Sequence, residues 1–570
     1  MRRASLRIAA ALMLCVITTW CVGRVLHTTP LYRYSFEWFL KLGPGERLFY
    51  ALHLAGGGIA VWLLSRALEP VLAERWPAIR PAFTSSRVLW VVSVFGAALA
   101  ALIGFVLLRD QVVTDDEYVY LFQSHLLLEG HASAAPPPLA LFFTNTVIGL
   151  QEGRWFGQYP PGHPLVLAPA LLLGEPRLMP ILLVGLNVFL TGLLVGRIMG
   201  SGWGIAAALL LVTSPLFLLT GGTLLSHGTA YFALVLGTYG ALRVSESGGW
   251  AWSLVCGAGI GLLVLTRPWT GVTLGIFPGL WLWRAARSRE DNRVLWPALL
   301  VLFASAVFFL LYNREQTGHP LLTGYDAIRR GGGQIEFGFG PIIPGVFAHT
   351  FFKGLRNAAL LVLRFHAWSW AWPIALLPVL YTLKRRRSRA NNAGLDRGLV
   401  RGAWWMLAVG FAAYVPYWSI GVNDTGPVKT YELLLPFTVL TVAGTREWAR
   451  ARGAAAPAAW ILASFLAGLL VFWPATIRHL DQLSRGVAAP LEAIERGVER
   501  PAVVFVPDPG FGDGESWVFG RPNPRPDLSD PVLYVRDLGA ADRDLLRALP
   551  GRRGYRFQRL PGDVRLLPIP

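Results

Sequence analysis

Charged side chains are scarce in this chain. Aspartate, glutamate, lysine and arginine make up only 15% of its 570 residues, whereas 54% are hydrophobic. A soluble protein of this size carries more charge and fewer long apolar runs. Apolar runs of about 20 residues, the length that a helix needs to cross a bilayer, recur along most of the sequence. The alternating segments of a membrane β-barrel, each about ten residues long, are not seen. The composition therefore predicts a mainly α, polytopic transmembrane helical bundle.

Cysteine is equally scarce, which bears on metal binding and on disulfides. The three cysteines, Cys15, Cys21 and Cys256, all lie in apolar runs. They have neither the spacing of a zinc site nor the pairing of a disulfide framework. The acids Asp115 to Glu117 could offer oxygen ligands to a divalent cation, but consecutive residues of a helix point in different directions. We therefore expect no cofactor, with a divalent cation as the less favoured alternative.

Acidic residues are outnumbered by basic ones, 34 to 52, which gives a net charge of +18. Lysine is rare, so nearly all of this charge is arginine. The basic residues cluster in short loops, at Arg2-Arg3, Arg284–Arg293, Lys384–Arg389 and Arg446–Arg452. This is the pattern of positive-inside topology, and a nucleic-acid partner is not expected. The arginine excess and the lack of organelle signals indicate a multi-pass protein of a bacterial inner membrane.

About 13 membrane spans are predicted from the apolar runs. We place them near residues 7–27, 47–66, 88–108, 178–197, 203–220, 227–243, 250–266, 269–285, 294–312, 367–383, 402–420, 431–447 and 457–475. With the N-terminus inside, all basic loops fall on the cytoplasmic side. The first run lacks a convincing small-residue cleavage site, so we expect it to be retained.

Two further apolar stretches are not counted as spans. Gly345–Phe365 carries three basic residues and fits an amphipathic helix in the outer interface. Counting it would place the basic cluster after residue 383 on the outside. His163–Leu173 is too short to span and follows two prolines and a glycine, so we expect a surface or re-entrant helix.

Three regions follow from this topology. Residues 1–87 would hold two spans and a cytoplasmic loop, and residues 88–475 the main transmembrane region. Long outer loops are expected at 109–163, 313–345 and 421–430. The polar tail, 476–570, contains four strand-like segments and a short helical one, at Ala502–Pro507, Val532–Arg536, Tyr555–Leu560, Val564–Ile569 and Ala541–Leu549. We expect the tail to form a small periplasmic α/β domain.

The acidic cluster Asp115-Asp116-Glu117 follows the third span. Thr114 and Glu117 have the spacing of a capping box, and acids in the first turn of a helix suit its macrodipole. That structural interpretation accounts for all three acids without chemistry. The helix continues with aromatic and apolar residues, 118–122, which would hold a carboxylate at the membrane surface. Ionisable groups there are candidates for function.

A second motif of the same outer loop spans Trp155 to Pro164. Its aromatic residues and two consecutive prolines fit either a rigid interfacial turn or the wall of a cavity for a sugar or a lipid. His163 could be a polar contact in that cavity or a structural residue. The sequence leaves both interpretations open.

Six short motifs, none specific by itself, occur in order between residues 88 and 447. In chain order they are Asp116-Glu117-Tyr118, Tyr159-Pro160-Pro161-Gly162-His163-Pro164, Ser226-His227, Leu265-Thr266-Arg267-Pro268, Asn313 to Tyr325 with Thr317-Gly318-His319-Pro320, and Thr430-Tyr431-Glu432-Leu433-Leu434-Leu435-Pro436. The ordered set resembles the polytopic GT-C glycosyltransferases, the superfamily of protein mannosyltransferases and lipid A aminoarabinose transferases. Two positions depart from the pattern, because Lys429-Thr430-Tyr431 stands where Arg-Tyr is common and Asp115 is an additional acid.

The resemblance implies transfer of a sugar from a polyprenyl-phosphate donor to an envelope acceptor on the outer side, with inversion. The acceptor would be a glycolipid, a polysaccharide or a protein, and membrane lipids would surround the spans. Asp116 is implied as general base, with Asp115 as the alternative. The phosphate leaving group needs cations, for which Arg267, Lys353, Arg356 and Lys429 are candidates. Other candidate substrate-binding residues are Glu117, Tyr118, Tyr159, His163, His227, Tyr325 and Tyr431.

Two other function classes remain as alternatives. A transporter or flippase of lipid-linked sugars would show charges deep in several spans and, in many folds, paired halves. The charges of this chain gather at the outer surface and no internal duplication is visible, which favours an enzyme. A non-catalytic scaffold in envelope assembly is the second alternative.

Overall fold

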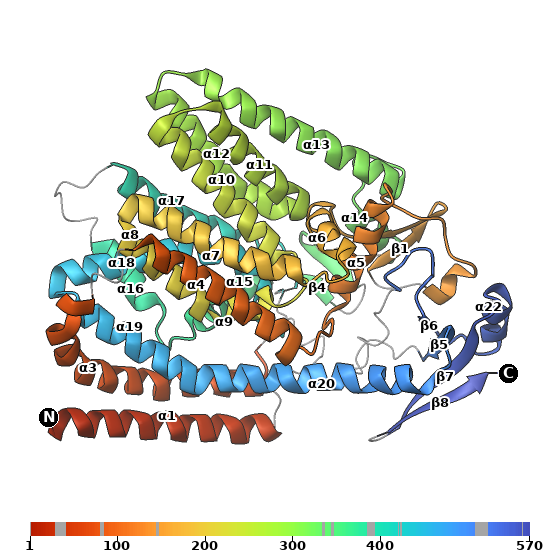
Figure 1. Cartoon of the computed structure of the whole chain (residues 1–570), viewed down its shortest axis with the longest axis horizontal. Helices are drawn as coiled ribbons and strands as arrows, with labels where there is room; N and C mark the ends of the chain where they lie inside the picture. Colours follow the sequence, from red (N-terminus) through yellow and green to blue (C-terminus); the bar gives the residue numbers. More distant parts are fainter. Residues whose placement is uncertain are drawn as a thin grey trace.

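Helices dominate the computed structural model of the chain, with two β-hairpins and one four-stranded sheet at one end (Figure 1). Part of the outer loop predicted at 313–345 lies outside the described residues, beginning at Gly333. Most of the basic cluster that follows Lys384 also lies outside them. The structure describes residues 2–28, 42–79, 85–143, 147–332, 337–343, 347–384, 394–419, 421, 424–507, 523–560 and 563–569.

Six helical segments among the described residues are long and apolar enough to cross a membrane. They lie in α1 (Arg2–Thr28), in α2 (Pro44–Leu52) with α3 (Gly58–Ile79), in α4 (Ser86–Ala101) with the π-helical turn Leu102–Leu107, in α7 (Leu178–Met199), in the segment ending with α13 (Trp296–Thr317), and in α19 (Ala455–Ala467) with α20 (Trp473–Gly497). The chain is therefore a multi-pass membrane protein. The number of 13 spans stays a prediction.

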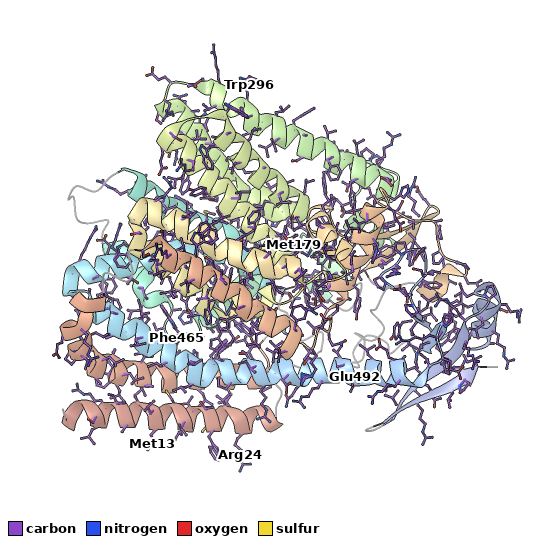
Figure 2. All side chains as sticks on the ribbon, in the orientation of Figure 1. Met13, Arg24, Met179, Trp296, Phe465 and Glu492 are labelled. Atoms are coloured by element: carbon purple, nitrogen blue, oxygen red, sulfur yellow. The ribbon has the colours of Figure 1, made fainter. Side chains whose placement is uncertain are left out.

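The outer surface of the bundle is apolar, as contact with lipid requires. Met13 and Trp296 project from it (Figure 2) and are 62% and 69% exposed. A soluble monomer rarely exposes large contiguous apolar patches.

Further helices of the bundle are α10 (His227–Ser247), α11 (Trp250–Thr266), α12 (Pro268–Ser288), α17 (Gly394–Ala412) and α18 (Leu434–Arg452).

The predicted span 203–220 is not one helix. The helices α8 (Ser201–Thr213) and α9 (Pro215–Gly221) meet at Ser214 with a bend of 64°. Pro215 has no N–H to continue the hydrogen-bond ladder of α8. Ser214 is extended, and its hydroxyl caps α9 by accepting a hydrogen bond from Phe217 N at 3.1 Å. The segment is thus a broken span or a re-entrant pair.

Two other predicted spans have different bounds. The span predicted at 367–383 is interrupted, because α15 (Phe351–Trp370) ends before Ala371, which has a left-handed φ of 55°, and α16 (Leu376–Lys384) begins after a turn. α15 begins six residues later than the amphipathic stretch predicted from Gly345 and ends five residues beyond it. The helix α17 lies where a span was predicted at 402–420, but it ends earlier, at Ala412, four residues before Pro416.

A buried ion pair joins the N-terminal helices to the rest of the bundle. Arg364 of α15 and Glu46 of α2 are both fully buried, and two hydrogen bonds of 2.5 and 2.7 Å connect them. Tyr50 donates a hydrogen bond to Glu46 at 3.1 Å and accepts one from Trp368 Nε1 at 3.1 Å. Planar, paired hydrogen bonds between arginine and a carboxylate give a defined geometry. This pair fixes how α2 packs on α15.

The predicted outer loops contain short ordered elements. The first loop holds α5 (Asp115–Leu128), the antiparallel hairpin of β1 (Ile148–Gln151) and β2 (Arg154–Gly157), and then α6 (Gly162–Leu172). The second holds α14 (Gly324–Gly332) and the hairpin of β3 (Gly340–Ile343) and β4 (Phe347–His349). A 3-10 helix, Val428–Leu433, precedes α18. These elements surround the candidate site.

The strands and the short helix predicted after residue 500 are present. The strands β5 (Ala502–Val506), β6 (Val532–Arg536), β7 (Arg553–Leu560) and β8 (Asp563–Ile569) form a sheet of order β6-β5-β7-β8, and α22 (Asp542–Ala548) connects β6 to β7. β5 is buried on both faces: Val503 and Phe505 share a core with α5, and Val504 shares another with Ile494 of α20. A periplasmic location for this unit stays a prediction.

The helix α20 extends well past the predicted start of the tail. It forms one continuous helical run with α19, from Ala455 to Gly497, 43 residues in all. At about 1.5 Å per residue the run is about 65 Å long, roughly twice the thickness of a hydrocarbon core. Its far end packs on β8 (Figure 1). The sheet is therefore carried on the end of a membrane helix.

Candidate active site

The acidic cluster lies at the start of α5, as predicted. Thr114 is the N-cap in an extended conformation, and Asp115, Asp116 and Glu117 form the first turn. Asp115 Oδ1 accepts a hydrogen bond from Asp116 N at 3.1 Å, and burial raises the pKa of Asp115. Asp116 Oδ1 instead accepts a short hydrogen bond from the hydroxyl of Tyr159. The two neighbouring acids thus have different partners.

Glu117 is fully buried and serves the fold of this region. Its Oε1 accepts hydrogen bonds from Val113 N at 3.2 Å and from Thr114 Oγ1 at 3.1 Å, and its Oε2 accepts one from Leu224 N at 2.7 Å. The predicted capping box is only half right: Thr114 donates to Glu117 and makes no hydrogen bond to the helix backbone. Because all these donors are internal, Glu117 holds the start of α5 against the segment before α10, and its assignment as a substrate-binding residue stays a prediction.

Aromatic rings line the region beside Asp116. The ring of Tyr159 lies 4.5 Å from that of Tyr120 and 5.2 Å from that of Tyr325, measured between centroids. Tyr118, on the same helix, is also buried. Burial and the charge of Asp116 raise the pKa of Tyr159 well above its ordinary value. Tyr159 therefore stays protonated and acts as a hydrogen-bond donor.

Gln123 fixes the backbone of Tyr159. Its Nε2 donates to Tyr159 O at 2.6 Å and to Tyr312 Oη at 2.5 Å, and its Oε1 accepts from Tyr159 N at 3.3 Å. The loop can lie this close to α5 because Gly157 has no side chain. A Cβ at Gly157 would come within 2.6 Å of Val119.

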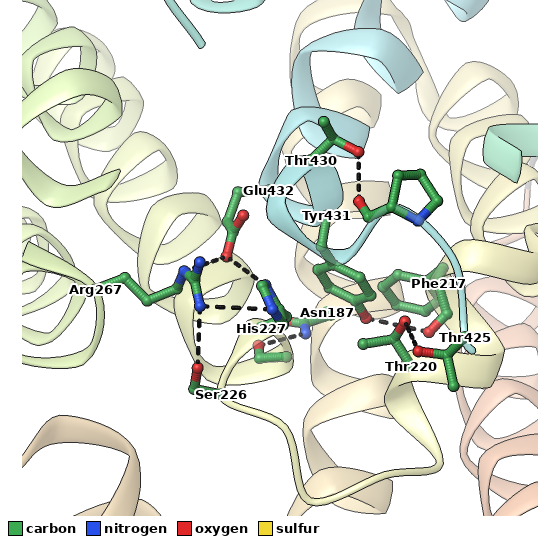
Figure 3. Close-up of polar contacts among 12 residues, drawn as sticks. Asn187, Phe217, Thr220, Ser226, His227, Arg267, Thr425, Thr430, Tyr431 and Glu432 are labelled. Atoms are coloured by element: carbon green, nitrogen blue, oxygen red, sulfur yellow. Dashed lines mark hydrogen bonds and ion pairs between the residues drawn. The ribbon is translucent and has the colours of Figure 1, made fainter. Parts of the chain in front are cut away.

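A cluster of charged residues lies at the junctions of α9 with α10 and of α11 with α12 (Figure 3). Arg267 Nε is 3.4 Å from Glu432 Oε1, and Arg267 Nη1 lies 3.3 Å from Ser226 Oγ and 3.5 Å from His227 Nε2. Arginine can only donate hydrogen bonds, so His227 Nε2 is the acceptor. The proton of His227 is then on Nδ1, which donates to Glu432 Oε1 at 3.3 Å. Glu432 is buried, whereas the Arg267 side chain is 22% exposed. One guanidinium is thus held by the protein but still reaches solvent.

Tyr120 connects the acid to the arginine. Its hydroxyl donates to Ser226 Oγ at 3.0 Å, the same atom that Arg267 contacts, and the charges of Asp116 and Arg267 both act on it. Gly162 brings the loop after Tyr159 against the segment preceding Arg267, because a Cβ there would come within 2.7 Å of Thr266 N. Asp116 and Arg267 therefore face a common region.

Lys429 and Tyr431 lie on the far side of His227. The Lys429 ammonium donates to Ser419 O at 3.2 Å, lies 4.4 Å from the centroid of the Tyr417 ring, and is within electrostatic range of His227. Tyr431 is fully buried, and its hydroxyl donates to Phe217 O at 3.2 Å. Lys429 thus adds a second cation near His227 and Arg267. Tyr431 packs beside His227, with 6.0 Å between the ring centroids.

Three other predicted residues have partners elsewhere. His163 is buried between Thr229 Oγ1 at 2.8 Å and Leu224 O at 2.7 Å, which fits a structural residue. On α15, Lys353 contacts Ala348 O and the ring of Phe347, and Arg356 contacts Asn357. The structure does not bring these two cations into the cluster around Arg267.

Sequence reasoning missed several residues of this region. Gln123 and Glu432 were not candidates, although Glu432 stands within the Thr430-to-Pro436 motif as an acid at the start of an apolar span, which was an available signal. Arg177 was also missed. It is nearly fully buried and bonds Asp110 Oδ1 at 2.5 Å and Gly222 O at 2.9 Å, which ties the segment before α5 to the segment before α10.

No cluster of metal ligands is present among the described residues. They contain no group of three or more histidine, cysteine, aspartate or glutamate side chains that could hold a metal ion. The oxygens of Asp115, Asp116 and Glu117 that are described above already accept hydrogen bonds from protein donors. The expectation of a metal-independent site remains a prediction.

Comparison with known proteins gives matches by structure. No protein-family profile and no curated protein matches the sequence. A crystal structure of ArnT from Cupriavidus metallidurans bound to undecaprenyl phosphate is 14% identical, with a TM-score of 0.50 over 81% of this chain and 92% of that one. The chain therefore shares the fold of this ArnT structure. The arabinosyltransferase EmbB from Mycobacterium smegmatis also matches, at 17% identity and a TM-score of 0.40, over 80% of this chain and 45% of that one. The predicted GT-C fold is confirmed by the ArnT match.

Proposed function

We propose that the chain is a membrane glycosyltransferase that moves a sugar from a polyprenyl-phosphate donor to an acceptor of the cell envelope. The observation that supports this most is a series of contacts that leads from Asp116 to Arg267. Tyr159 donates to Asp116, the ring of Tyr159 lies 4.5 Å from that of Tyr120, and both Tyr120 and Arg267 contact Ser226 Oγ. A carboxylate and a partly exposed guanidinium on facing sides of one region suit a reaction that removes a proton and releases a phosphate. The undecaprenyl phosphate in the similar ArnT structure is consistent with this donor class.

In the proposed reaction Asp116 is the general base. The Asp116 carboxylate takes the proton from the acceptor hydroxyl while the hydroxyl oxygen forms a bond to the anomeric carbon of the sugar. The bond from the anomeric carbon to the phosphate oxygen breaks at the same time, so the configuration inverts. A positioned base contributes roughly 10²- to 10⁴-fold to such a step.

The leaving group is a phosphate and needs charge stabilisation more than a proton. Arg267 and Lys429 would supply it, since arginine presents several donors to a phosphate and lysine a compact charge. The aromatic rings of Tyr120, Tyr159 and Tyr325 would form the wall against which the sugar lies. A single catalytic carboxylate suffices here, unlike in glycoside hydrolases, which use two.

The test is a transfer assay with purified protein. Wild type and Asp116→Asn would be incubated with polyprenyl-phosphate-linked sugars carrying a label and with envelope extracts as acceptor, and folding would be checked by circular dichroism. The proposal requires label on the acceptor with wild type and a loss of roughly 10²-fold or more with Asp116→Asn. Equal transfer by both proteins would remove Asp116 from its proposed role. Movement of the labelled lipid across vesicles without transfer would favour the flippase alternative.

The location follows from the same proposal. Polyprenyl-phosphate sugars that serve envelope assembly are used at the outer face of a bacterial inner membrane, so α5 and the charged cluster would lie in the periplasm. The four-stranded sheet would lie there too, because it shares a core with α5. Its proximity to the first outer loop suits a unit that helps to hold the acceptor.

A further inference from the structure

We propose that Gln123 and Tyr159 are positioning residues for the Asp116 carboxylate. Gln123 fixes the place of Tyr159, and the Tyr159 hydroxyl holds Asp116 Oδ1 and so sets the orientation of the carboxylate. This inference deepens the proposed function and rests on it.

The hold of Gln123 on Tyr159 is specific in direction and distance. The side-chain amide of Gln123 bonds both backbone polar groups of Tyr159. Its Nε2 donates to Tyr159 O at 2.6 Å, and its Oε1 accepts from Tyr159 N at 3.3 Å. Gln123 is fully buried, so water does not compete for these groups. Tyr312 Oη accepts a further hydrogen bond from Gln123 Nε2 and thereby orients the amide. Buried amides in such networks have a single favourable orientation.

The helix α5 serves as the common frame. Gln123 follows Asp116 by seven residues, about two helical turns, so both side chains leave similar sides of α5. The backbone of Tyr159 is therefore held by Gln123, near the middle of α5. Its hydroxyl contacts Asp116, in the first turn of the same helix. A loop residue is positioned in this way with the accuracy of a helix.

The hydrogen bond from Tyr159 has two effects on the carboxylate. It fixes the rotation of Asp116, and it favours the charged form, which is the form that accepts a proton. The other titratable groups near this pair are Asp115, Glu117 and Tyr120 on α5, Tyr325 on α14, and Arg267 at the junction of α11 and α12. Tyr159 donates a hydrogen bond to Asp116 Oδ1.

The experiment measures transfer as a function of pH for wild type and Tyr159→Phe. Without the donated hydrogen bond the carboxylate takes up a proton more readily, so the acidic limb of the profile should move to higher pH by about one unit. Transfer at the pH optimum should also fall about tenfold, mainly in kcat. A limb that stays in place overturns the role of Tyr159, because a merely structural tyrosine would not move it.

Gln123→Met has a matched control in Gln316→Met. Gln316 is also buried and holds the same loop, through a 2.6 Å hydrogen bond to Gly157 O. Its 3.3 Å hydrogen bond to Tyr312 Oη connects it to Tyr159 only through that tyrosine, whereas Gln123 bonds the Tyr159 backbone directly. Both variants should lower thermal stability, whereas Gln123→Met alone should move the acidic limb as Tyr159→Phe does. If the two methionine variants have the same profile, Gln123 is not a positioning residue. If wild type shows no transfer at all, the proposed function fails before this inference is reached.

A second inference rests on a cavity at the opposite end of the bundle. We propose that this cavity binds a phosphate-bearing anion, the head group of an anionic phospholipid. It has a volume of about 550 Å³ and is lined by Arg7 of α1, Arg66 and Glu69 of α3, and Arg452 of the turn between α18 and α19. Three candidate spans begin or end beside it, which puts it at the depth of lipid head groups. Three arginines and one glutamate line it, a net charge of +2, so an anion would relieve the repulsion among the arginines.

The test compares lipids retained by the purified protein in native mass spectrometry. Wild type should retain phosphatidylglycerol in preference to phosphatidylcholine. The triple variant Arg7→Gln, Arg66→Gln, Arg452→Gln should lose about tenfold or more of this retention. The control triple variant Arg284→Gln, Arg287→Gln, Arg293→Gln removes the same charge from another basic loop and should retain the lipid. Equal losses in both overturn the site, and binding of inorganic phosphate without a lipid preference overturns the lipid head group as its source.

Discussion

Glu432 holds Arg267 through an ion pair in which Glu432 Oε1 is 3.4 Å from Arg267 Nε, and the same oxygen is 3.3 Å from His227 Nδ1. Glu432 is buried and the Arg267 side chain is partly exposed, so one edge of the guanidinium contacts protein groups. The charge of Arg267 is therefore fixed in place by the protein, and in the proposed reaction this would avoid reorganisation as the phosphate develops negative charge.

Arg267→Lys should impair transfer although it keeps the charge. Lysine lacks the planar fork that lets Arg267 reach Glu432, Ser226 and His227 together. We expect kcat/KM for the lipid-phosphate donor to fall about 10- to 100-fold, measured with the donor varied and the acceptor saturating. A variant as active as wild type would mean that only the charge matters. Glu432→Gln should cause a smaller loss of the same kind.

Asp115→Asn and Asp116→Asn should differ sharply. Asparagine at 115 keeps an oxygen that can accept the hydrogen bond from Asp116 N, so transfer should stay within a few-fold of wild type. Asparagine at 116 removes the proposed base, with an expected loss of roughly 10²-fold or more. Initial rates of label transfer decide between them. The reverse order of losses would make Asp115 the base.

Chelation should leave activity unchanged. The carboxylates of the acidic cluster are engaged with protein donors, which suits hydrogen bonding better than metal coordination. Protein treated with EDTA and passed over a desalting column should transfer label at the untreated rate. Loss of activity that returns with a divalent cation would refute this expectation.

Breaking the buried pair of Glu46 and Arg364 should destabilise the bundle. Glu46→Ala leaves a buried guanidinium without its carboxylate, at a cost of about 3–5 kcal/mol. The double variant Glu46→Leu, Arg364→Met should be closer to wild type, because no charge is left unpaired. Thermal unfolding in detergent, followed by intrinsic fluorescence, compares the three proteins. A double variant less stable than Glu46→Ala would show that the pair adds net stability.

The sequence was informative where a local rule decides the outcome. Long apolar runs located most helices, turn and strand residues located the strands after residue 500, and the Thr114-to-Glu117 spacing located the start of α5. Its failures have physical causes. Ser214-Pro215 and Trp370-Ala371 lie within apolar stretches, so hydropathy alone does not show that the helix stops there.

The candidate site shows the same limit. Asp116, Tyr159, His227, Arg267 and Lys429 were named from ordered motifs, and the structure places them around one region. Their connections depend on long-range contacts that no local pattern contains. Gln123 is a polar residue in an apolar helix, and only the fold brings Tyr159 to it. The sequence could not show that Glu117 is buried, because its partner Leu224 lies more than 100 residues away.

The unbroken helix from Ala455 to Gly497 also fixes the geometry of the sheet that it carries. Each residue of an α-helix adds about 1.5 Å of height and about 100° of rotation. Asp481 contacts Arg109 at 2.8 Å and His479 contacts Asp424 at 2.8 Å, so two faces of α20 are already registered against the segments that precede α5 and α18. One residue inserted after Asp481 would turn the sheet by more than a quarter of a circle. Length changes in this helix are therefore tolerable mainly in steps close to whole turns.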